Sequence, residues 1–269
     1  MRKNVRKILP ITVVLVGVII VCVLIISKIG DCESEKLKYL YSEYISSSQN
    51  IETETGIIRI NTVKVQKDVD VESVDIEYPY LNDNLDVVAR DINTQIYKFV
   101  FFSPGGHFVL ENDGYVTDIE TRYGIPYVDD TLISIFFETY GREFGNYSEG
   151  CAGRNFSLES GKLLALSDFY EGAELKKLLK DGMTAGTVTI ISDLPIREDK
   201  KKEYFQTFLD GLGTYYETDD GLTGYMNYAD NFFFTEDGIC LIGEPYPSTV
   251  ETVFIEMKID KIPTIKSDI

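Results

Sequence analysis

The side chains best suited to chemistry are few and widely spaced along this chain. The chain has one histidine, His107. A Ser/His/Asp triad would need an activated serine near it, and the G-x-S-x-G motif that presents such a serine is absent from the sequence. Paired carboxylates at Asp129–Asp130 and Asp219–Asp220 could act as acid and base or hold calcium. The D-x-D-x-D-G spacing of a calcium loop is absent, and an Asp pair before Gly221 is typical of a turn. We therefore expect no catalytic residue, no cofactor and no bound metal.

Two cysteines, Cys151 and Cys240, fall in separate strand-like runs in the later part of the chain. An extracytoplasmic location would permit a disulfide between them, and two buried free thiols are the alternative. The chain has no C-x-x-C spacing and no Cys/His cluster, so a zinc site is not expected.

Tyrosine is abundant, with 18 residues, and it gathers with glycine and acidic residues in the stretch 211–230. Tyrosine supplies large, half-polar contact area at low entropic cost, which favours binding surfaces. Packing at the edges of the core is the alternative role. The candidate binding residues are Tyr215, Tyr216, Asp219, Asp220, Tyr225 and Tyr228.

The N-terminus has the pattern of a membrane anchor. Residues 8–27 carry no charge, and twenty helical residues would be about 30 Å long, close to the hydrocarbon thickness of a bilayer. Basic residues in 1–7 predict a cytoplasmic tail, with everything after residue 28 outside the cell membrane. A retained single-pass anchor is favoured over a cleaved signal peptide because the apolar run is long and no A-x-A pattern follows. A lipoprotein would use Cys32, but Asp31 fits that cleavage site poorly.

The charge of the chain is strongly acidic, with a net value of −18. Five cations and one carboxylate precede Glu33, so residues 33–269 carry 21 cations against 43 carboxylates, a net charge of −22. Such a surface repels nucleic acid and anionic lipid headgroups and attracts cationic partners. A generic acidic surface without a specific partner is the alternative.

Before the main domain, we expect a stalk and linker over residues 28–56. Residues 33–48 have helix-forming composition, residues 46–50 read as a break, and residues 51–56 read as linker. The domain itself is expected at 57–262, followed by a short tail at 263–269.

Hydrophobic periodicity within 57–262 predicts strands and helices in irregular blocks. Strands are expected at 57–67, 74–78, 114–127, 131–140, 151–158, 187–191, 231–234, 238–242 and 250–259. Pro79 would end the second strand. Helices are expected at 84–102, capped by Asn82 or Asn84, at 171–182 with Leu175, Leu178 and Leu179 inward, and at 198–212. This order predicts an α+β fold with a largely antiparallel sheet packed against two to three helices, preceded by one transmembrane helix.

Three stretches together resemble a known domain. They are Ile76-Glu77-Tyr78-Pro79-Tyr80 with the helix after it, 132–170 with its Leu-Glu-Ser-Gly-Lys turn at 158–162, and Asn231-Phe232-Phe233-Phe234-Thr235-Glu236-Asp237-Gly238. Their order and spacing over 57–262 are similar to the PdaC/RsiV-like extracytoplasmic domain. That domain occurs in lysozyme-sensing membrane anti-sigma factors and beside the catalytic domain of some peptidoglycan deacetylases.

The resemblance implies a non-enzymatic binding domain whose first ligand to test is a lysozyme-like protein or a cell-wall component. The family often has a histidine in the run that here reads 147–153, and no histidine stands there. Residues 1–7 are too short for a sigma-binding segment, so we expect no anti-sigma function. The alternatives are an enzyme acting on wall glycans through two carboxylates and a structural subunit of an envelope complex.

Overall fold

The computed structural model describes residues 42–54, 56–69, 72–82, 86–102, 116–143, 146–192, 198–211, 231–243 and 253–266. The chain divides into two compact units, Met1–Glu43 and Tyr44–Ile269. The predicted anchor at 8–27, His107, Cys32 and the tyrosine-rich stretch from 212 to 230 lie outside the described residues. Within those residues, no helix has the length and apolar character needed to cross a bilayer.

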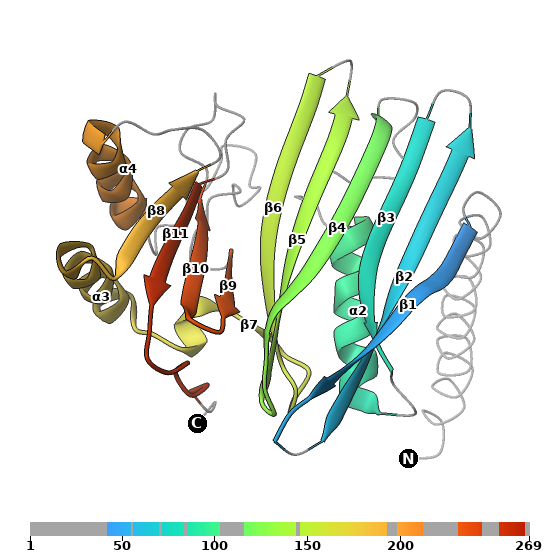
Figure 1. The fold of residues 1–269 in the computed structure, drawn as a ribbon, viewed down its shortest axis with the longest axis horizontal. Coiled ribbons are helices and arrows are strands. Elements are labelled where there is room, and N and C mark those ends of the chain that lie inside the picture. Colours follow the sequence, from blue (N-terminus) through green and yellow to red (C-terminus); the bar gives the residue numbers. More distant parts are fainter. Residues whose placement is uncertain are drawn as a thin grey trace, which may run out of the picture. The chain divides into compact units, whose positions relative to one another are not determined.

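The larger of two sheets, here the large sheet, has seven strands in the order β1-β2-β3-β4-β5-β6-β7 (Figure 1). Its strands are β1 (Ser42–Glu52), β2 (Ile57–Val69), β3 (Glu72–Leu81), β4 (Val116–Val128), β5 (Leu132–Glu143), β6 (Asn146–Ser157) and β7 (Leu163–Leu164). From β2 to β7 the pairing is antiparallel except between β3 and β4. A parallel pair needs a crossover, and helix α2 (Val87–Phe102) lies between these two strands in the chain.

The other sheet, here the small sheet, has four strands in the order β8-β11-β10-β9, all antiparallel. Its strands are β8 (Val188–Ser192), β9 (Phe232–Thr235), β10 (Gly238–Gly243) and β11 (Val253–Lys258). The short helix η1 (Leu166–Asp168) and helix α3 (Gly172–Ala185) connect it to the large sheet along the chain, and helix α4 (Glu198–Gly211) connects β8 to β9 within it. The predicted α+β class is therefore correct, but one expected sheet is in fact two.

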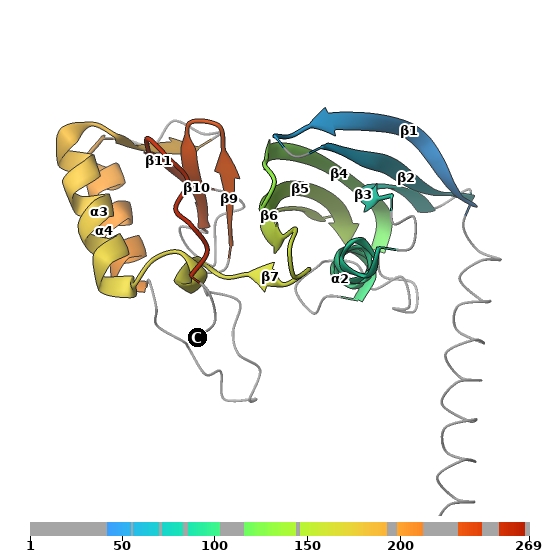
Figure 2. The same ribbon diagram turned by 90° about the horizontal axis from the view of Figure 1, so that it is seen from below.

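Apolar periodicity explains which faces are buried. Val74 and Ile76 of β3 are buried, as are Ile92 and Ile96 of α2, the helix that contacts β3. In the small sheet, alternate residues such as Val253, Ile255 and Met257 are buried, as their spacing predicts. Helices α3 and α4 lie side by side against the small sheet (Figure 2).

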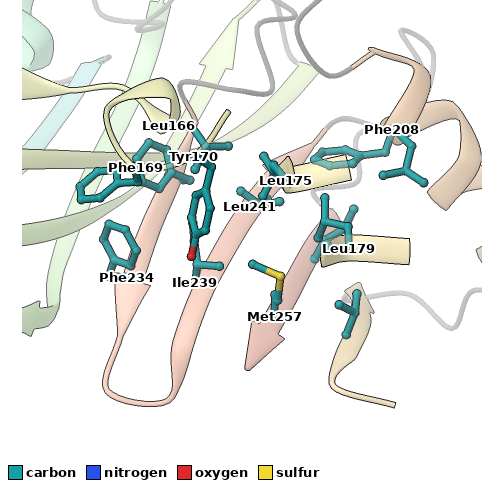
Figure 3. Packing of buried hydrophobic residues seen from close by; sticks show 14 of the residues in the cluster. Leu166, Phe169, Tyr170, Leu175, Leu179, Phe208, Phe234, Ile239, Leu241 and Met257 are labelled. Carbon is teal, nitrogen blue, oxygen red and sulfur yellow. The ribbon is translucent and has the colours of Figure 1, made fainter. Parts of the chain in front are cut away.

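One hydrophobic cluster joins η1, α3, α4 and the small sheet. Figure 3 shows its aromatic end, where Phe169 stacks edge-on against Phe234 with ring centroids 4.9 Å apart. Leu175 and Leu179 of α3 point into the cluster, but Leu178 is 39% exposed, so its predicted inward position is wrong. Leu178 lies about 100° around the helix from Leu179, beyond the width of the buried stripe.

The expected stalk and linker are wrong over residues 42–52, because these residues form β1. The segment is exposed on both sides, so it lacks the apolar alternation by which a strand is recognised. A turn follows, in which the Thr53 N–H donates to Gly56 O at 2.8 Å, and the chain returns as β2. The predicted break at 46–50 is therefore strand interior.

Two predicted boundaries also differ. Pro79 does not end β3, which continues to Leu81 with Pro79 opposite Thr62 of β2. β4 pairs with β3 only over Ser73–Ile76, so a residue that lacks an N–H is tolerated beyond that point. At the start of α2, Asp86 provides the cap rather than Asn82, since its Oδ1 accepts from the Val88 N–H at 2.9 Å, and the other predicted cap, Asn84, lies outside the described residues.

The predicted tail at 263–269 is in part attached to the domain. The Lys266 N–H donates to Asp168 O at 2.8 Å, and its Nζ lies 3.3 Å from a Glu171 carboxylate oxygen. Ile262 and Ile265 pack against the hydrophobic cluster. The folded unit therefore extends at least from Tyr44 to Lys266.

Candidate binding surface

The face of the large sheet opposite α2 carries a continuous set of charged side chains, here called the polar face. Strand register places these side chains together, because paired residues share a face. The pairs are Lys64–Glu77 and Gln66–Asp75 between β2 and β3, Asp75–Glu120 between β3 and β4, and Glu120–Tyr140 and Arg122–Glu138 between β4 and β5.

Two cations hold the centre of the polar face together. Lys64 Nζ lies 3.0 Å from Asp75 Oδ1, donates to Asp75 Oδ2 at 3.3 Å and donates to Glu77 Oε1 at 3.2 Å. The Arg122 guanidinium donates to Asp75 Oδ2 at 3.0 Å and lies 2.9 Å from Glu120 Oε1. The side chains of Lys64 and Asp75 are 17% and 32% exposed, whereas that of Glu120 is 52% exposed. The outermost charge is therefore a carboxylate.

These contacts fix the charge state of the centre. Burial disfavours ionisation of Asp75, but hydrogen bonds from Lys64 and Arg122 outweigh it and lower the pKa of its carboxyl. The hydrogen bond to Asp75 likewise raises the pKa of Lys64 above its ordinary value. A carboxylate held ionised in this way can attract a cation but is unsuited to act as a general acid, which needs a raised pKa.

Hydroxyl groups extend the polar face toward β1. The hydroxyls of Thr62 and Tyr123 are 2.7 Å apart, and Ser47 Oγ donates to Thr62 Oγ1 at 2.9 Å. Tyr44 on β1 donates to Gln66 Oε1 at 3.0 Å. Burial raises the pKa of Tyr123, so its hydroxyl stays neutral and available for hydrogen bonding at ordinary pH. The surface is thus acidic around Glu120 and hydroxyl-rich near β1.

The other end of this face is covered by the small sheet. Gly124 and Gly153 lie two residues after Arg122 and Cys151, and Phe136 lies two residues before Glu138, so all three share the face of those residues. Phe136 packs against Phe233 with ring centroids 4.9 Å apart. We call this junction, formed by Ser134, Gly153, Asn155, Asn231, Phe232 and Phe234, the seam.

Side chains at the seam replace missing strand partners. The Asn231 amide accepts from the Gly153 N–H at 2.9 Å and donates to Cys151 O at 3.2 Å. Asn155 Nδ2 donates to Phe232 O at 2.8 Å. In this way the edge of β9 is joined to β6 through side-chain amides.

Cys151 and Cys240, for which the sequence leaves open either a disulfide or two thiols, are not joined by a disulfide in the structure; Cys151 is half-buried and Cys240 is buried. Cys151 lies in β6, which contributes Gly153 and Asn155 to the seam, and Cys240 lies in β10, the neighbour of β9. Burial raises the pKa of the Cys240 thiol well above its ordinary value, with smaller contributions from Glu256 and Cys151. Cys240 is therefore protonated and unreactive at ordinary pH.

The candidate binding residues Tyr215, Tyr216, Asp219, Asp220, Tyr225 and Tyr228 all lie outside the described residues. The other carboxylate pair is described, and its two members have separate positions. Asp129 Oδ1 accepts from Thr131 N–H at 2.7 Å and Leu132 N–H at 2.8 Å, and Oδ2 accepts from Tyr127 OH at 2.7 Å. Asp130 instead lines a cavity near the start of α2. Asp129 is thus a turn residue, placed between the two strands that the sequence predicts at 114–127 and 131–140.

Replacing Asp129 with alanine should destabilise the protein in a pH-dependent way. Burial opposes the charge of Asp129, but hydrogen bonds from Thr131, Tyr127 and Leu132 lower its pKa below 3.8 in the folded state. A depressed pKa stabilises the fold above the unfolded value and loses this contribution as pH falls through the folded value. Urea unfolding at pH 7 and below pH 4 measures this. The difference in free energy of unfolding between the wild type and the Asp129→Ala variant should be smaller in acid, and an equal difference at both pH values would contradict the prediction.

The cavity near α2 measures about 280 Å³ and lies between the hairpin residues Thr53 and Arg59, the first turn of α2 and Asp130. Leu81, Ala89 and Ile92 supply its buried apolar lining. Its volume is below the range of about 300–1,000 Å³ that small-molecule sites occupy. In the described part of the chain, no three His, Cys, Asp or Glu residues are grouped to hold a metal ion. The polar face is therefore the better candidate site.

Sequence reasoning missed the polar face as a site. Its residues are the solvent-side positions of alternating strands, which single-sequence patterns assign to ordinary surface. The available signal was that Asp75 and Glu77 alternate with apolar residues of β3 while the cations Lys64 and Arg122 hold matching positions on its neighbours.

No protein-family model matches the chain, and a search of curated protein sequences finds no match either. The solved structures that are similar to it include two described as members of the DUF3298 family, which is of the PdaC/RsiV-like domain type. The one from Bacteroides fragilis is 13% identical, covers 75% of this chain and 90% of its own, and has a TM-score of 0.45. The one from Pseudomonas aeruginosa is 14% identical, covers 83% and 89%, and has a TM-score of 0.34. Neither identity is high enough to transfer a function.

Proposed function

We propose that this chain is a membrane-anchored extracytoplasmic binding protein, without enzymatic activity, whose ligand is a cationic protein such as lysozyme or a cationic cell-wall component. The anchor rests on the uncharged run at 8–27 with its basic flank. The observation that carries the binding role is the polar face, where Asp75, Glu77, Glu120 and Glu138 outnumber Lys64 and Arg122.

The chemistry of the polar face supports a cationic ligand. Lys64 and Arg122 are shared among Asp75, Glu77 and Glu120, so two positive charges stand against four negative ones when Glu138 is included, and the excess is negative with Glu120 well exposed. Tyr140, 39% exposed and paired with Glu120, adds an amphipathic contact beside them. The net charge of −22 beyond residue 33 would speed encounter with a cationic protein.

Substituting Glu120→Gln and Glu138→Gln together should weaken lysozyme binding. Exposed charge pairs contribute about 0.2–1 kcal/mol each, so the double variant should lose about 2–30-fold in affinity at low ionic strength. Titration calorimetry of the full chain with lysozyme at low and high salt measures this. Raised salt should lower the affinity of the wild type for lysozyme steeply, and it should reduce the difference in affinity between the wild type and the double variant.

The matched control is Glu159→Gln with Glu236→Gln, which removes the same charge at exposed turn positions outside the polar face. Its affinity should stay within about twofold of wild type, since only overall steering is changed. Equal losses in both double variants would mean that net charge alone matters and that the polar face is not the site. An absence of heat and of any complex with the wild type would exclude lysozyme as the ligand.

A further inference from the structure

In the part of the chain that the structure describes, the outer edge of β1 is an open sheet edge. Among the described strands, β1 is the terminal strand of the large sheet and pairs with β2, and it spans Ser42–Glu52 (Figure 1). Residues 43–50 are all exposed. A strand at the end of a sheet presents unpaired N–H and C=O groups that another strand can join.

β1 lacks the lysines, prolines and interruptions by which proteins commonly block such edges. Natural edges carry lysine or proline, are very short, or are interrupted. Between Ser42 and Ile58 there is no Lys, Arg or Pro, and the exposed Ile45 and Tyr44 are well suited to strand pairing.

Side-chain hydrogen bonds to β2 also stabilise β1 in its strand conformation. Ser46 Oγ donates to Thr62 O at 3.3 Å, Ser47 Oγ to Thr62 Oγ1 at 2.9 Å and Ser48 Oγ to Asn61 Oδ1 at 2.7 Å. These side-chain bonds supplement its pairing with β2. Because β1 is already ordered, the binding of a partner strand would not include the entropic cost of ordering it.

We propose that β1 is a docking edge for an extended segment of a cationic partner, which adds to the large sheet as a further strand. This rests on the proposed function and deepens it by naming how the partner binds. The charge of the edge selects the occupant: Glu43 and Glu52 lie near the ends of β1 and Glu54 follows in the turn, with no cation among them. A segment with Lys or Arg at each end of an uncharged centre is complementary.

A second copy of the chain fits this edge less well. Each copy has a net charge of −18, so two copies repel. In the antiparallel register that pairs Ser47 with Ser48, Glu43 of each copy would stand opposite Glu52 of the other, and facing like charges destabilise a strand pair.

The test uses the full chain and a synthetic ten-residue peptide, capped at both termini, with alternating Thr and Val between a terminal Lys at each end. Hydrogen exchange is followed by mass spectrometry in residues 44–52 and in β8, the edge strand of the small sheet, as internal control. At saturating peptide, exchange in 44–52 should slow by about tenfold or more while β8 is unchanged. Two control peptides, one with Glu ends and one with Pro in place of Val, should have no such effect.

The proposal is overturned if exchange in 44–52 is unchanged, if either control peptide slows it equally, or if raised protein concentration alone slows it. Failure of this proposal is distinguishable from failure of the proposed function. If lysozyme binds and the Glu120/Glu138 variant weakens it while the peptide leaves β1 unchanged, docking at the edge alone is wrong. If the Lys-ended peptide protects β1 but lysozyme does not bind, the docking edge stands and lysozyme is the wrong ligand.

Discussion

Gly153→Ala should be the most damaging single methyl addition at the seam, lowering stability by about 3 kcal/mol or more. A Cβ on Gly153 would lie 1.9 Å from Phe232 O and 2.2 Å from Phe232 C. These are backbone atoms of β9, which is held on its other side by pairing with β10. The added methyl group therefore cannot be accommodated by a side-chain rotation and must push the small sheet away from β6.

Thermal unfolding of the full chain measures this effect, and the loss should lower Tm by about 6–12 °C. Gly124→Ala is the matched control, because Gly124 and Gly153 both pair with Phe136 of β5 and so occupy one row of the same face. A Cβ on Gly124 would meet no atom within 4 Å. If the Gly153→Ala and Gly124→Ala variants have the same Tm, β9 does not approach β6 as closely as described.

Asn155→Ala should have a comparable effect through lost hydrogen bonds. Asn155 is 1% exposed; its Nδ2 donates to Phe232 O at 2.8 Å and its Oδ1 accepts from Ser134 Oγ at 2.6 Å. Ser134 Oγ in turn accepts from the Phe234 N–H at 2.8 Å. Removing the amide leaves a buried carbonyl and a buried hydroxyl without these partners, at about 1–3 kcal/mol each. We expect a total loss of about 3–4 kcal/mol in urea unfolding.

A double-mutant cycle with Ser134→Ala separates this network from simple packing loss. Because the two side chains share one hydrogen bond, the double variant should lose less than the sum of the singles, with a coupling of about 0.5–3 kcal/mol. The control Asn50→Ala makes the same change at an exposed position of β1 and should alter the free energy of unfolding by no more than about 0.5 kcal/mol. Additive losses at Asn155 and Ser134 would mean that the two side chains act independently.

The strands that bury one face were predictable from the sequence, and the others were not. In β11 every second residue, Val253, Ile255 and Met257, is buried, so the period of two in its sequence follows directly from the burial of one face. β1 has no such period because it is exposed on both sides, and Ser46–Asn50 has the composition of a turn. Its strand conformation depends on hydrogen bonds to β2, which local sequence does not encode.

The seam could not be predicted because its contacts join distant parts of the chain through polar residues. Ser134 binds the Phe234 N–H across 100 positions, and Asn155 reaches Phe232 O across 77. A buried Ser or Asn within a strand has the same sequence signature as an exposed one. For the same reason the charged positions of β3 have the sequence pattern of ordinary surface, whereas the tyrosines of the stretch 211–230 have the composition typical of a binding site.

The central claim, that the polar face receives a cationic partner, is tested most directly by zero-length carbodiimide crosslinking of the full chain to lysozyme. This reagent joins a carboxylate to a lysine amine in contact with it, so mass spectrometry of the crosslinked peptides locates the interface. We predict crosslinks at Glu120 and Glu138, lost when both are changed to glutamine. Crosslinks confined to other exposed carboxylates, such as Glu159, Glu171 and Glu236, would contradict the claim.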